Sequence, residues 1–290
     1  VRQSVGRARI GAVLEPSELL AVGSMLYAVR RFKAFIADQS AATPLLDEAA
    51  AGLTVLRPLE NLIESTVGEN GEVRDDASAE LKRIRREIRL TQTRIREKLD
   101  SILRSSDYQK MFQENLVTVR VDRYVIPVRQ EYRHSFPGIV HDQSASGATV
   151  FIEPMPVVVL NNEVKQLIAA DKAEVERILR AVSVQTGAVS HSILTNCGLM
   201  AFFDLVFAKA KLALDLKASE PEIVELPAMD LKQARHPLIP AAMVVPVDIR
   251  VGGSFTTLLI TGPNTGGKTV CLKTAGLLAL MAQAGLFIPA

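Results

Sequence analysis

Apolar residues recur every three or four positions through most of the first 220 residues, which is the spacing that places side chains on one face of an α-helix. The first well-marked helix begins at Pro16, because proline is favoured in the first turn of a helix. Its apolar positions are Leu19, Leu20, Val22, Met25, Leu26, Val29, Phe32, Phe35 and Ile36. Two further short helical segments are marked by Thr43-Pro44 and Arg57-Pro58. Residues 1–78 are therefore expected to form part of a helical core.

Two longer helices are predicted on either side of residues 116–156. The first lies in residues 79–115. Its apolar residues are alternately three and four positions apart, a spacing that forms a narrow apolar seam and is typical of a helix that packs against another as in a coiled coil. This seam consists of Leu81, Ile84, Ile88, Thr91, Ile95, Leu99 and Ile102. The second helix is expected to follow Asn161-Asn162, two good N-cap residues, within residues 157–220. An antiparallel pair is the economical arrangement, because each helix then buries its seam against the other.

Between these helices, residues 116–156 change to a period of two. Val117, Val119 and Val121 alternate with polar residues, which is the pattern of a half-buried strand. Turn-forming residues at 135–138 and 144–147 separate further extended stretches. We therefore expect a compact β-rich module inserted at the tip of the helical pair.

Basic residues occur both on the first long helix and in the β-rich module. On the helix, Arg85, Arg86 and Arg89 alternate with acidic residues, which favours a solvated face with ion pairs between successive turns. The alternative is a basic face that contacts nucleic acid phosphates. The β-rich module is neutral overall, so contact with nucleic acid there would rest on a few placed arginines. These candidates are Arg120, Arg123, Arg129 and Arg133.

The last 90 residues change character again. A helix over residues 199–216 is apolar on several sides and is expected to lie in a core. Short strands are predicted at residues 223–226, 244–251 and 256–261, and Gly252-Gly253-Ser254 is expected to join the last two as a hairpin.

The third predicted strand leads into a glycine loop and the start of a helix, the context that a P-loop requires. Its glycines would let successive backbone N–H groups turn toward a phosphate, and the positive end of the helix dipole would face the same anion. Lys268 would reach the β- and γ-phosphates, and the Thr269 hydroxyl would bind Mg²⁺. The loop reads Gly262, Pro263, Asn264, Thr265, Gly266, Gly267, Lys268 and Thr269.

Composition narrows the functional classes only slightly. Thirty-four lysines and arginines against 32 acidic residues leave a net charge of +2, which is too balanced to indicate nucleic acid binding by itself. Two distant cysteines, Cys197 and Cys271, fit no metal or redox spacing and are typical of reduced thiols. No stretch reads as a signal peptide or a membrane span. We therefore expect a cytoplasmic protein.

Several motifs resemble the second bacterial branch of the MutS family, the endonuclease MutS or MutS-two branch. The loop from Gly262 to Thr269 is similar to the MutS-type P-loop, and Arg235-His236-Pro237 resembles the motif that precedes it. Residues 122–128 and 138–147 are similar to the clamp of that branch. This resemblance covers nearly the whole chain.

The resemblance implies a mainly α-helical protein with antiparallel lever helices, an inserted β clamp and an incomplete α/β P-loop ATPase domain. Its implied boundaries are core 1–78, lever 79–115, clamp 116–156, returning lever and core helices 157–220, and ATPase start 221–290. Val244 and Val245 would lie beside adenine. Val247 stands at a position where the family usually has an asparagine. The implied cofactors are ATP and Mg²⁺.

The same resemblance implies what the whole protein does. Members of this branch form homodimers through their ATPase domains, bind branched DNA to suppress recombination, and split collided ribosomes through contacts that include rRNA. Their nuclease activity belongs mainly to a C-terminal domain that has no counterpart in this sequence.

One requirement for catalysis is missing from the chain. No acidic residue follows Asp248, whereas ATP hydrolysis on this scaffold needs a second Mg²⁺-anchoring aspartate and a group that positions water. We therefore expect a piece of a longer protein that ends just past the P-loop, binds nucleotide weakly by itself and does not hydrolyse it.

Two other functions are consistent with parts of the sequence. The chain could be a structural arm in which the P-loop binds no nucleotide, or a metabolic P-loop kinase. The long helical arm and the lack of a substrate-binding constellation argue against the kinase.

Overall fold

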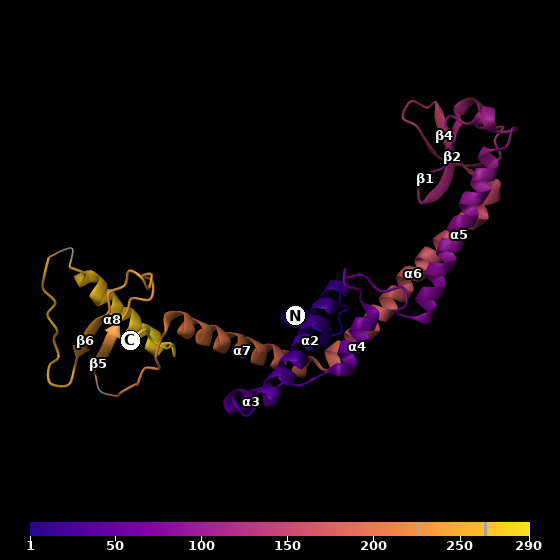
Figure 1. Ribbon diagram of the computed structural model, residues 1–290. Coiled ribbons are helices and arrows are strands. Elements are labelled where there is room, and N and C mark those ends of the chain that lie inside the picture. Colours follow the sequence, from indigo (N-terminus) through magenta and orange to yellow (C-terminus); the bar gives the residue numbers. More distant parts are fainter. Residues whose placement is uncertain (226, 264–265) are drawn as a thin grey trace. The chain divides into compact units, whose positions relative to one another are not determined.

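A computed structural model describes residues 1–225, 227–263 and 266–290. The chain divides into two compact units, residues 1–197 and 198–290, and each unit is described by itself. The helix α7 (Ser190–Leu216) begins in the first unit and ends in the second. Figure 1 labels the elements in chain order.

The base of the first unit is a helical core. Prolines stand in the first turns of three of its helices, as the sequence predicts, because a proline there gives up no helical hydrogen bond. Leu19, Val22 and Ile63 are buried at its centre, together with residues of two long helices, Leu81, Ile178 and Val182. The helices are α1 (Arg2–Arg9), α2 (Pro16–Asp38), α3 (Pro44–Ala51) and α4 (Arg57–Thr66).

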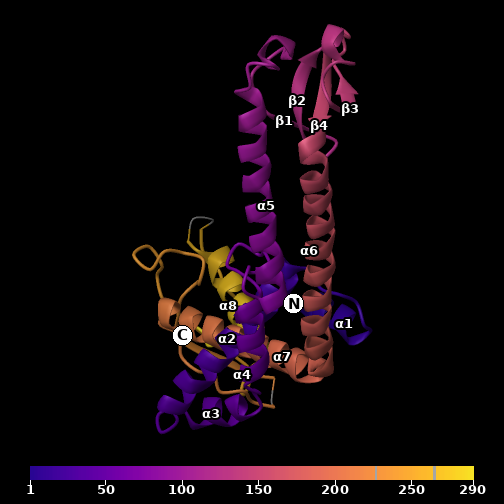
Figure 2. The same cartoon turned by 90° about the vertical axis from the view of Figure 1, so that its right-hand side faces the viewer.

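Two long antiparallel helices extend from this base, as Figure 2 shows. They are α5 (Ala79–Leu103) and α6 (Met155–Ala188). The predicted seam is confirmed, since Leu81, Ile95 and Leu99 are fully buried. From here on these two helices are called the lever.

The predicted start of α6 is wrong. The helix begins at Met155 rather than after Asn161-Asn162, because Pro156 supplies a first-turn proline and Pro154 has the extended conformation of an N-cap. Asn161 therefore lies inside the helix, where its side chain bonds to the backbone of Tyr124.

At the tip of the lever lies the predicted β-rich module, here called the clamp (residues 104–154). Its four-stranded antiparallel sheet has the order β1-β2-β4-β3. Ile126 and Val128 of the second strand pair with Ile152 and Val150 of the fourth, and these four side chains are fully buried beside the lever residue Leu99. The elements are η1 (Gln109–Met111), β1 (Thr118–Arg120), β2 (Arg123–Arg129), η2 (Gln130–Tyr132), β3 (Gly138–Gln143) and β4 (Thr149–Pro154).

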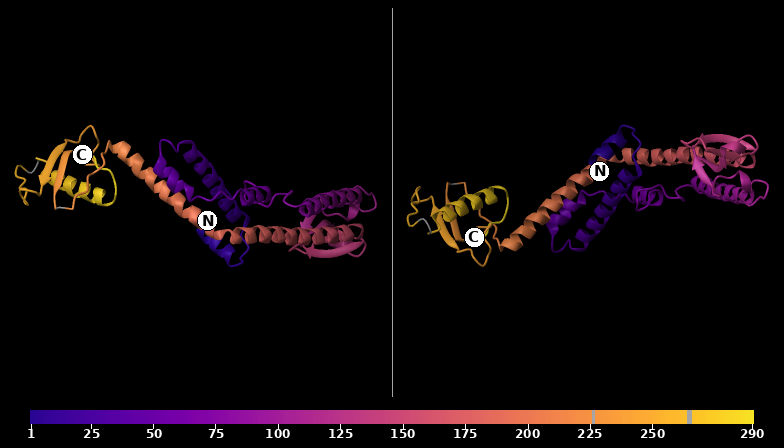
Figure 3. Two further views of the ribbon diagram at one scale, coloured as in Figure 1. Left: turned by 90° about the horizontal axis from the view of Figure 1, so that it is seen from below. Right: turned by 90° about the horizontal axis from the view of Figure 1, so that it is seen from above.

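The second unit contains the C-terminal half of α7, an antiparallel strand pair and one further helix. The strands are β5 (Met229–Ala234) and β6 (Val247–Val251), and the helix is α8 (Lys268–Gln283). Figure 3 shows α8 beside the strand pair. Leu278 and Met281 of α8 pack with Leu231 and Ile249 of the strands in a small core.

Two predicted strands of this unit are not formed. Residues 223–225 and 256–261 are irregular, residue 226 lies outside the described part, and strand β5 was not foreseen. Strands need partners for their backbone N–H and C=O groups, and the described residues contain no strand beside 256–261. The parallel sheet of a P-loop ATPase is accordingly absent from the described residues, although the helix after the loop is confirmed.

The predicted burial of α7 is also wrong. Phe203 is buried, but Leu205 and Leu214 are 55% and 78% exposed and Phe202 is half exposed. Among the described residues, too little apolar surface packs against this helix to cover all of its apolar side chains. Apolar residues on several sides of a helix therefore do not by themselves place it in a core.

Replacing Leu99 with alanine tests the lever seam. The change should lower the free energy of unfolding by about 2–5 kcal/mol, because it removes buried methyl groups and leaves a cavity. Leu90 of the same helix is 47% exposed, so Leu90→Ala should cost less than about 0.5 kcal/mol. Urea unfolding followed by circular dichroism measures both, and equal losses would contradict the described seam.

Candidate functional site

Two glycines of the predicted phosphate loop have unusual backbone conformations. Gly262 and Gly267 have φ angles of 140° and 77°, values that a residue with a Cβ rarely adopts. Between them, the backbone N–H of Gly266 donates to the Pro263 carbonyl at 3.0 Å. Asn264 and Thr265, which belong to the predicted site, lie outside the described residues. Both glycines are thus in conformations that glycine adopts far more readily than other residues.

Helix α8 begins with the last two residues of the predicted phosphate loop. Gly267 is its N-cap, so Lys268 and Thr269 lie in its first turn, where backbone N–H groups have no helical partner. Lys268 Nζ donates to the Gly262 carbonyl at 2.6 Å. Its ammonium group therefore lies at the loop that it would serve, and Thr269 is exposed beside it.

The two predicted base-binding valines differ in position. Val244 is partly buried and lines a cavity of about 350 Å³, whereas Val245 is 83% exposed and does not line it. The cavity lies between the end of α7 and residues 235–241, and Pro289 completes it. Arg235, His236 and Pro237, which stand out in the sequence only as a motif, all lie in the wall of this cavity.

Asp248, the last acidic residue of this sequence, is hydrogen-bonded to the backbone of a neighbouring strand. Asp248 Oδ1 accepts a hydrogen bond from the backbone N–H of Gln233 at 2.7 Å. No group of three or more histidine, cysteine, aspartate or glutamate side chains that could hold a metal occurs in the described part. Of the loop residues, the Thr269 hydroxyl has the chemistry to bind the Mg²⁺ of a nucleotide.

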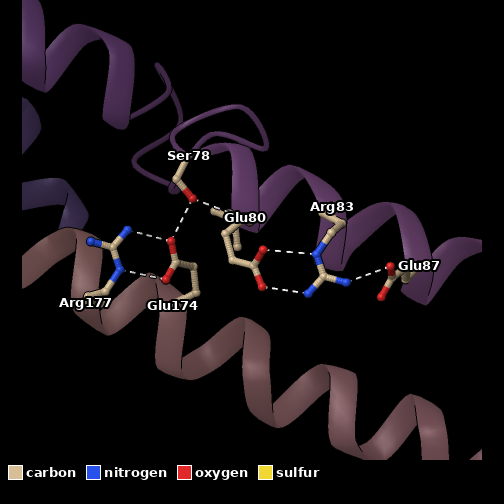
Figure 4. A network of polar contacts seen from close by, with 7 residues as sticks. Ser78, Glu80, Arg83, Glu87, Glu174 and Arg177 are labelled. Atoms are coloured by element: carbon tan, nitrogen blue, oxygen red, sulfur yellow. Dashed lines mark hydrogen bonds and ion pairs between the residues drawn. The ribbon is translucent and has the colours of Figure 1, made fainter.

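The lever is tied together at its base by hydrogen-bonded charges (Figure 4). Ser78 Oγ accepts from the backbone N–H of Leu81 at 2.9 Å and donates to Glu174 of α6 at 2.7 Å. Arg177 donates to both oxygens of the same carboxylate, at 2.7 and 2.8 Å. The cap of α5 is thereby fastened to α6.

Other charges on α5 pair with nearby acids, as the favoured interpretation of this helix expected. Arg83 bonds to Glu80 and Glu87, which are three and four positions away (Figure 4). Arg85 lies 2.9 Å from Asp171 of α6. These pairs stabilise the lever and favour the solvated, ion-paired face over a phosphate-binding face.

The clamp arginines fall into two groups. Arg123 bonds to both oxygens of Glu153 at 2.8 and 2.9 Å, and Arg120 lies over the Phe151 ring, 4.3 Å from its centroid. Arg129 and Arg133 are exposed, and neither forms an ion pair with any described residue. Of the four candidates, Arg129 and Arg133 are therefore the ones whose charge is available to a partner.

A buried carboxylate at the clamp base escaped sequence reasoning. Glu153 is fully buried and accepts from Arg123, from His141 Nε2 at 2.5 Å and from Asn161 Nδ2 at 2.7 Å. Such a charge is stable only when several donors satisfy it. Its donors come from separate strands and from α6, so no local sequence signal could have revealed the cluster.

Known proteins match the whole chain. Three relatives described as endonuclease MutS2 are 50% identical in Brevibacillus brevis, 49% in Bacillus cytotoxicus and 49% in Geobacillus sp., in each case over 100% of this chain. The chain is a MutS2 homologue. It spans 37% of the length of each of these relatives. No family model matches the chain.

The expected resemblance to the second MutS branch is thus confirmed. None of the helices that the structure describes in this MutS2 homologue is long and apolar enough to cross a membrane.

The contribution of the lever base to the stability of this MutS2 homologue should depend on pH. Hydrogen bonds from Arg177 and then Ser78 lower the pKa of Glu174 from 4.5 to about 2. Because the pKa is lower in the folded state, this stabilisation is complete above about pH 4.5 and is lost as the pH falls toward 2.

The stability difference between the natural protein and Glu174→Gln should therefore be largest near neutral pH and shrink below about pH 4.5. Thermal unfolding between about pH 6 and pH 2.5 measures it. The control is Glu176→Gln, an exposed residue on the same helix. A Glu174 difference that stays constant across this range would contradict the described network.

Proposed function

We propose that the chain is the core, lever, clamp and ATPase start of a MutS2-type ATPase that acts on nucleic acid. The glycine loop binds the triphosphate of Mg²⁺-ATP, and the clamp contacts the nucleic acid. The target is branched DNA, whose binding suppresses recombination, or the rRNA of collided ribosomes, which the enzyme splits. The relatives carry the name endonuclease, and we assign that activity to parts of the protein outside these residues.

The observation that carries this proposal is the loop from Gly262 to Thr269. It combines left-handed glycines, a helix that begins at Lys268 and a lysine ammonium held at the loop. This combination suits a phosphate chain, because free N–H groups, the helix dipole and a cation converge on one anion. Thr269 and the triphosphate would together hold Mg²⁺.

The lever and clamp support the nucleic acid part of the proposal. The ion pair between Arg85 and Asp171 joins the two lever helices, so the clamp is carried on two long paired helices. Of the four arginines predicted to contact nucleic acid, Arg129 and Arg133 are exposed and form no ion pair with a described residue, so we assign phosphate contacts to them. A pair of such helical arms suits a homodimer that encloses nucleic acid, and we propose that the whole protein dimerises through its ATPase domains in the cytoplasm.

A second candidate function is that of a structural arm whose P-loop binds no nucleotide. One observation favours it: Leu259, next to the loop, is 82% exposed and pairs with no described strand. In the proposed ATPase this segment gains strand neighbours from further chain. Nucleotide binding by the full-length natural protein separates the two candidates.

Replacing Lys268 with alanine tests the nucleotide site. In the full-length natural protein, the affinity for Mg²⁺-ATP should fall about 10- to 100-fold, because a charge-assisted hydrogen bond contributes about 1.5–3 kcal/mol. Lys273→Ala, an exposed lysine further along the same helix, should bind as the natural protein does. Competition against a fluorescent ATP analogue measures both, and an unaffected Lys268 variant would favour the structural arm.

The double variant Arg129→Ala, Arg133→Ala tests the clamp. The slope of log affinity for branched DNA against log salt should become shallower by about 2, since each lost phosphate contact removes roughly 0.9. Arg31→Ala, an exposed arginine on α2, is the control and should keep the natural slope. If the double variant also keeps it, these arginines do not contact phosphates, and the same titration with rRNA then tests the alternative target.

A further inference from the structure

The helical core of the first unit contains a cavity of about 500 Å³, lined by residues of α2, of α4 and of the loop that follows α4. The two helices pack against each other (Figure 2). A Cβ on Gly23 of α2 would lie only 2.9 Å from Ile63 Cγ2 of α4, so glycine permits this close approach beside the cavity. The cavity is within the size range of pockets that hold small molecules.

The wall of this cavity includes a buried carboxylate that two arginines share. Glu60 is 4% exposed, and Arg30 donates to both of its oxygens at distances of 3.0 to 3.1 Å. Arg57 Nη1 donates to Glu60 Oε1 at 2.7 Å. Because a guanidinium group is always charged in a protein, two positive charges here meet one carboxylate, and an excess of positive charge remains in the wall.

The two arginines keep donors that no described residue uses. In their hydrogen bonds to described residues, Arg57 uses only Nη1, and Arg30 uses only Nε and Nη2. Both side chains line the cavity, and their bonds to Glu60 hold the guanidinium groups in place. A guanidinium group that is fixed in this way and has N–H groups to spare is suited to bind a carboxylate.

The same cavity offers apolar and aromatic surface to the rest of a ligand. Ile63 and Val67 are almost fully buried and form part of the wall. The Tyr27 side chain also lines the cavity, is 51% exposed, and has its ring centroid 5.2 Å from Arg30 Cζ. Aromatic rings and guanidinium planes both stack on flat groups. A flat apolar body next to the carboxylate therefore fits this wall.

Two further acidic residues restrict the charge of the ligand. Glu64 and Glu69 line the cavity and are exposed. Their charges repel a ligand with several negative charges, such as a nucleotide or a nucleic acid strand. A ligand with one negative charge, placed at Arg57, suits both the basic and the acidic parts of the wall.

We propose that this cavity is a binding site for a small aromatic carboxylate. Arg57 and Arg30 bind the carboxylate group, Glu60 holds the two arginines, and Tyr27 and Ile63 contact the flat body. All of these residues belong to the first unit, whereas the glycine loop belongs to the second. The inference thus goes beyond the proposed function and does not depend on ATP binding.

Binding of 2-naphthoate to the full-length natural protein, measured by isothermal titration calorimetry, tests this site. One molecule should bind per chain, and 2-naphthamide, which has the same shape without the charge, should bind about 10-fold more weakly. Arg57→Ala should weaken the binding of 2-naphthoate about 10-fold and leave that of 2-naphthamide unchanged. Arg31→Ala, an exposed arginine on the same face-forming helix α2, is the matched control and should bind both compounds as the natural protein does.

The Arg57 variant should stay folded, because Glu60 keeps its bonds to Arg30. Ser24→Trp gives a second test, since Ser24 is exposed, lines the cavity and would carry a ring large enough to fill it. This variant should lose the binding of both compounds and keep the affinity for Mg²⁺-ATP. The inference is overturned if 2-naphthoate does not bind, if the acid and the amide bind equally, or if Arg57→Ala or Ser24→Trp binds 2-naphthoate as the natural protein does.

Discussion

The antiparallel contact between α5 and α6 is the constraint on which the first unit depends. An isolated helix of this length is only marginally stable in water, and burial of an apolar face supplies most of its stability in a protein. Each lever helix provides that face for the other, with Leu81, Ile95 and Leu99 fully buried. Because the residues at one end of this seam join the helical core and those at the other end join the clamp, the seam links two hydrophobic clusters.

Hydrogen-bonded carboxylates lie at both ends of this seam. At the base, Glu174 joins the cap of α5 to α6 through Ser78. At the tip, the buried Glu153 gathers donors from two strands and from Asn161 of α6. Removing one partner from such a cluster leaves a buried charge unsatisfied, which is far more costly than losing an exposed ion pair. Arg123 is therefore part of the framework that carries the clamp, whereas Arg129 remains at its surface.

The second unit shows which features of the predicted P-loop region depend only on neighbouring residues. Glycine conformation and a helix N-terminus are properties of a few neighbouring residues, so Gly262, Gly267 and the first turn of α8 take their local form in a unit with only a small core. A central strand is different, because its backbone groups need neighbours on both sides. Residues 256–261 accordingly remain irregular next to a well-formed helix.

The sequence by itself determined the features that depend on neighbours in the chain. Helical spacing with Pro16, Pro44 and Pro58 located helices of the core, alternation located the β-rich module, and the glycine loop located the start of α8, where a phosphate site stays a prediction. Only the tertiary structure decided which groups meet from distant segments. In the structure α6 begins at Met155 and much of α7 is exposed. Arg123 forms an ion pair and Asp248 a hydrogen bond within the fold. Local propensities act over a turn or two, whereas burial and hydrogen-bond satisfaction depend on partners that only the folded chain brings together.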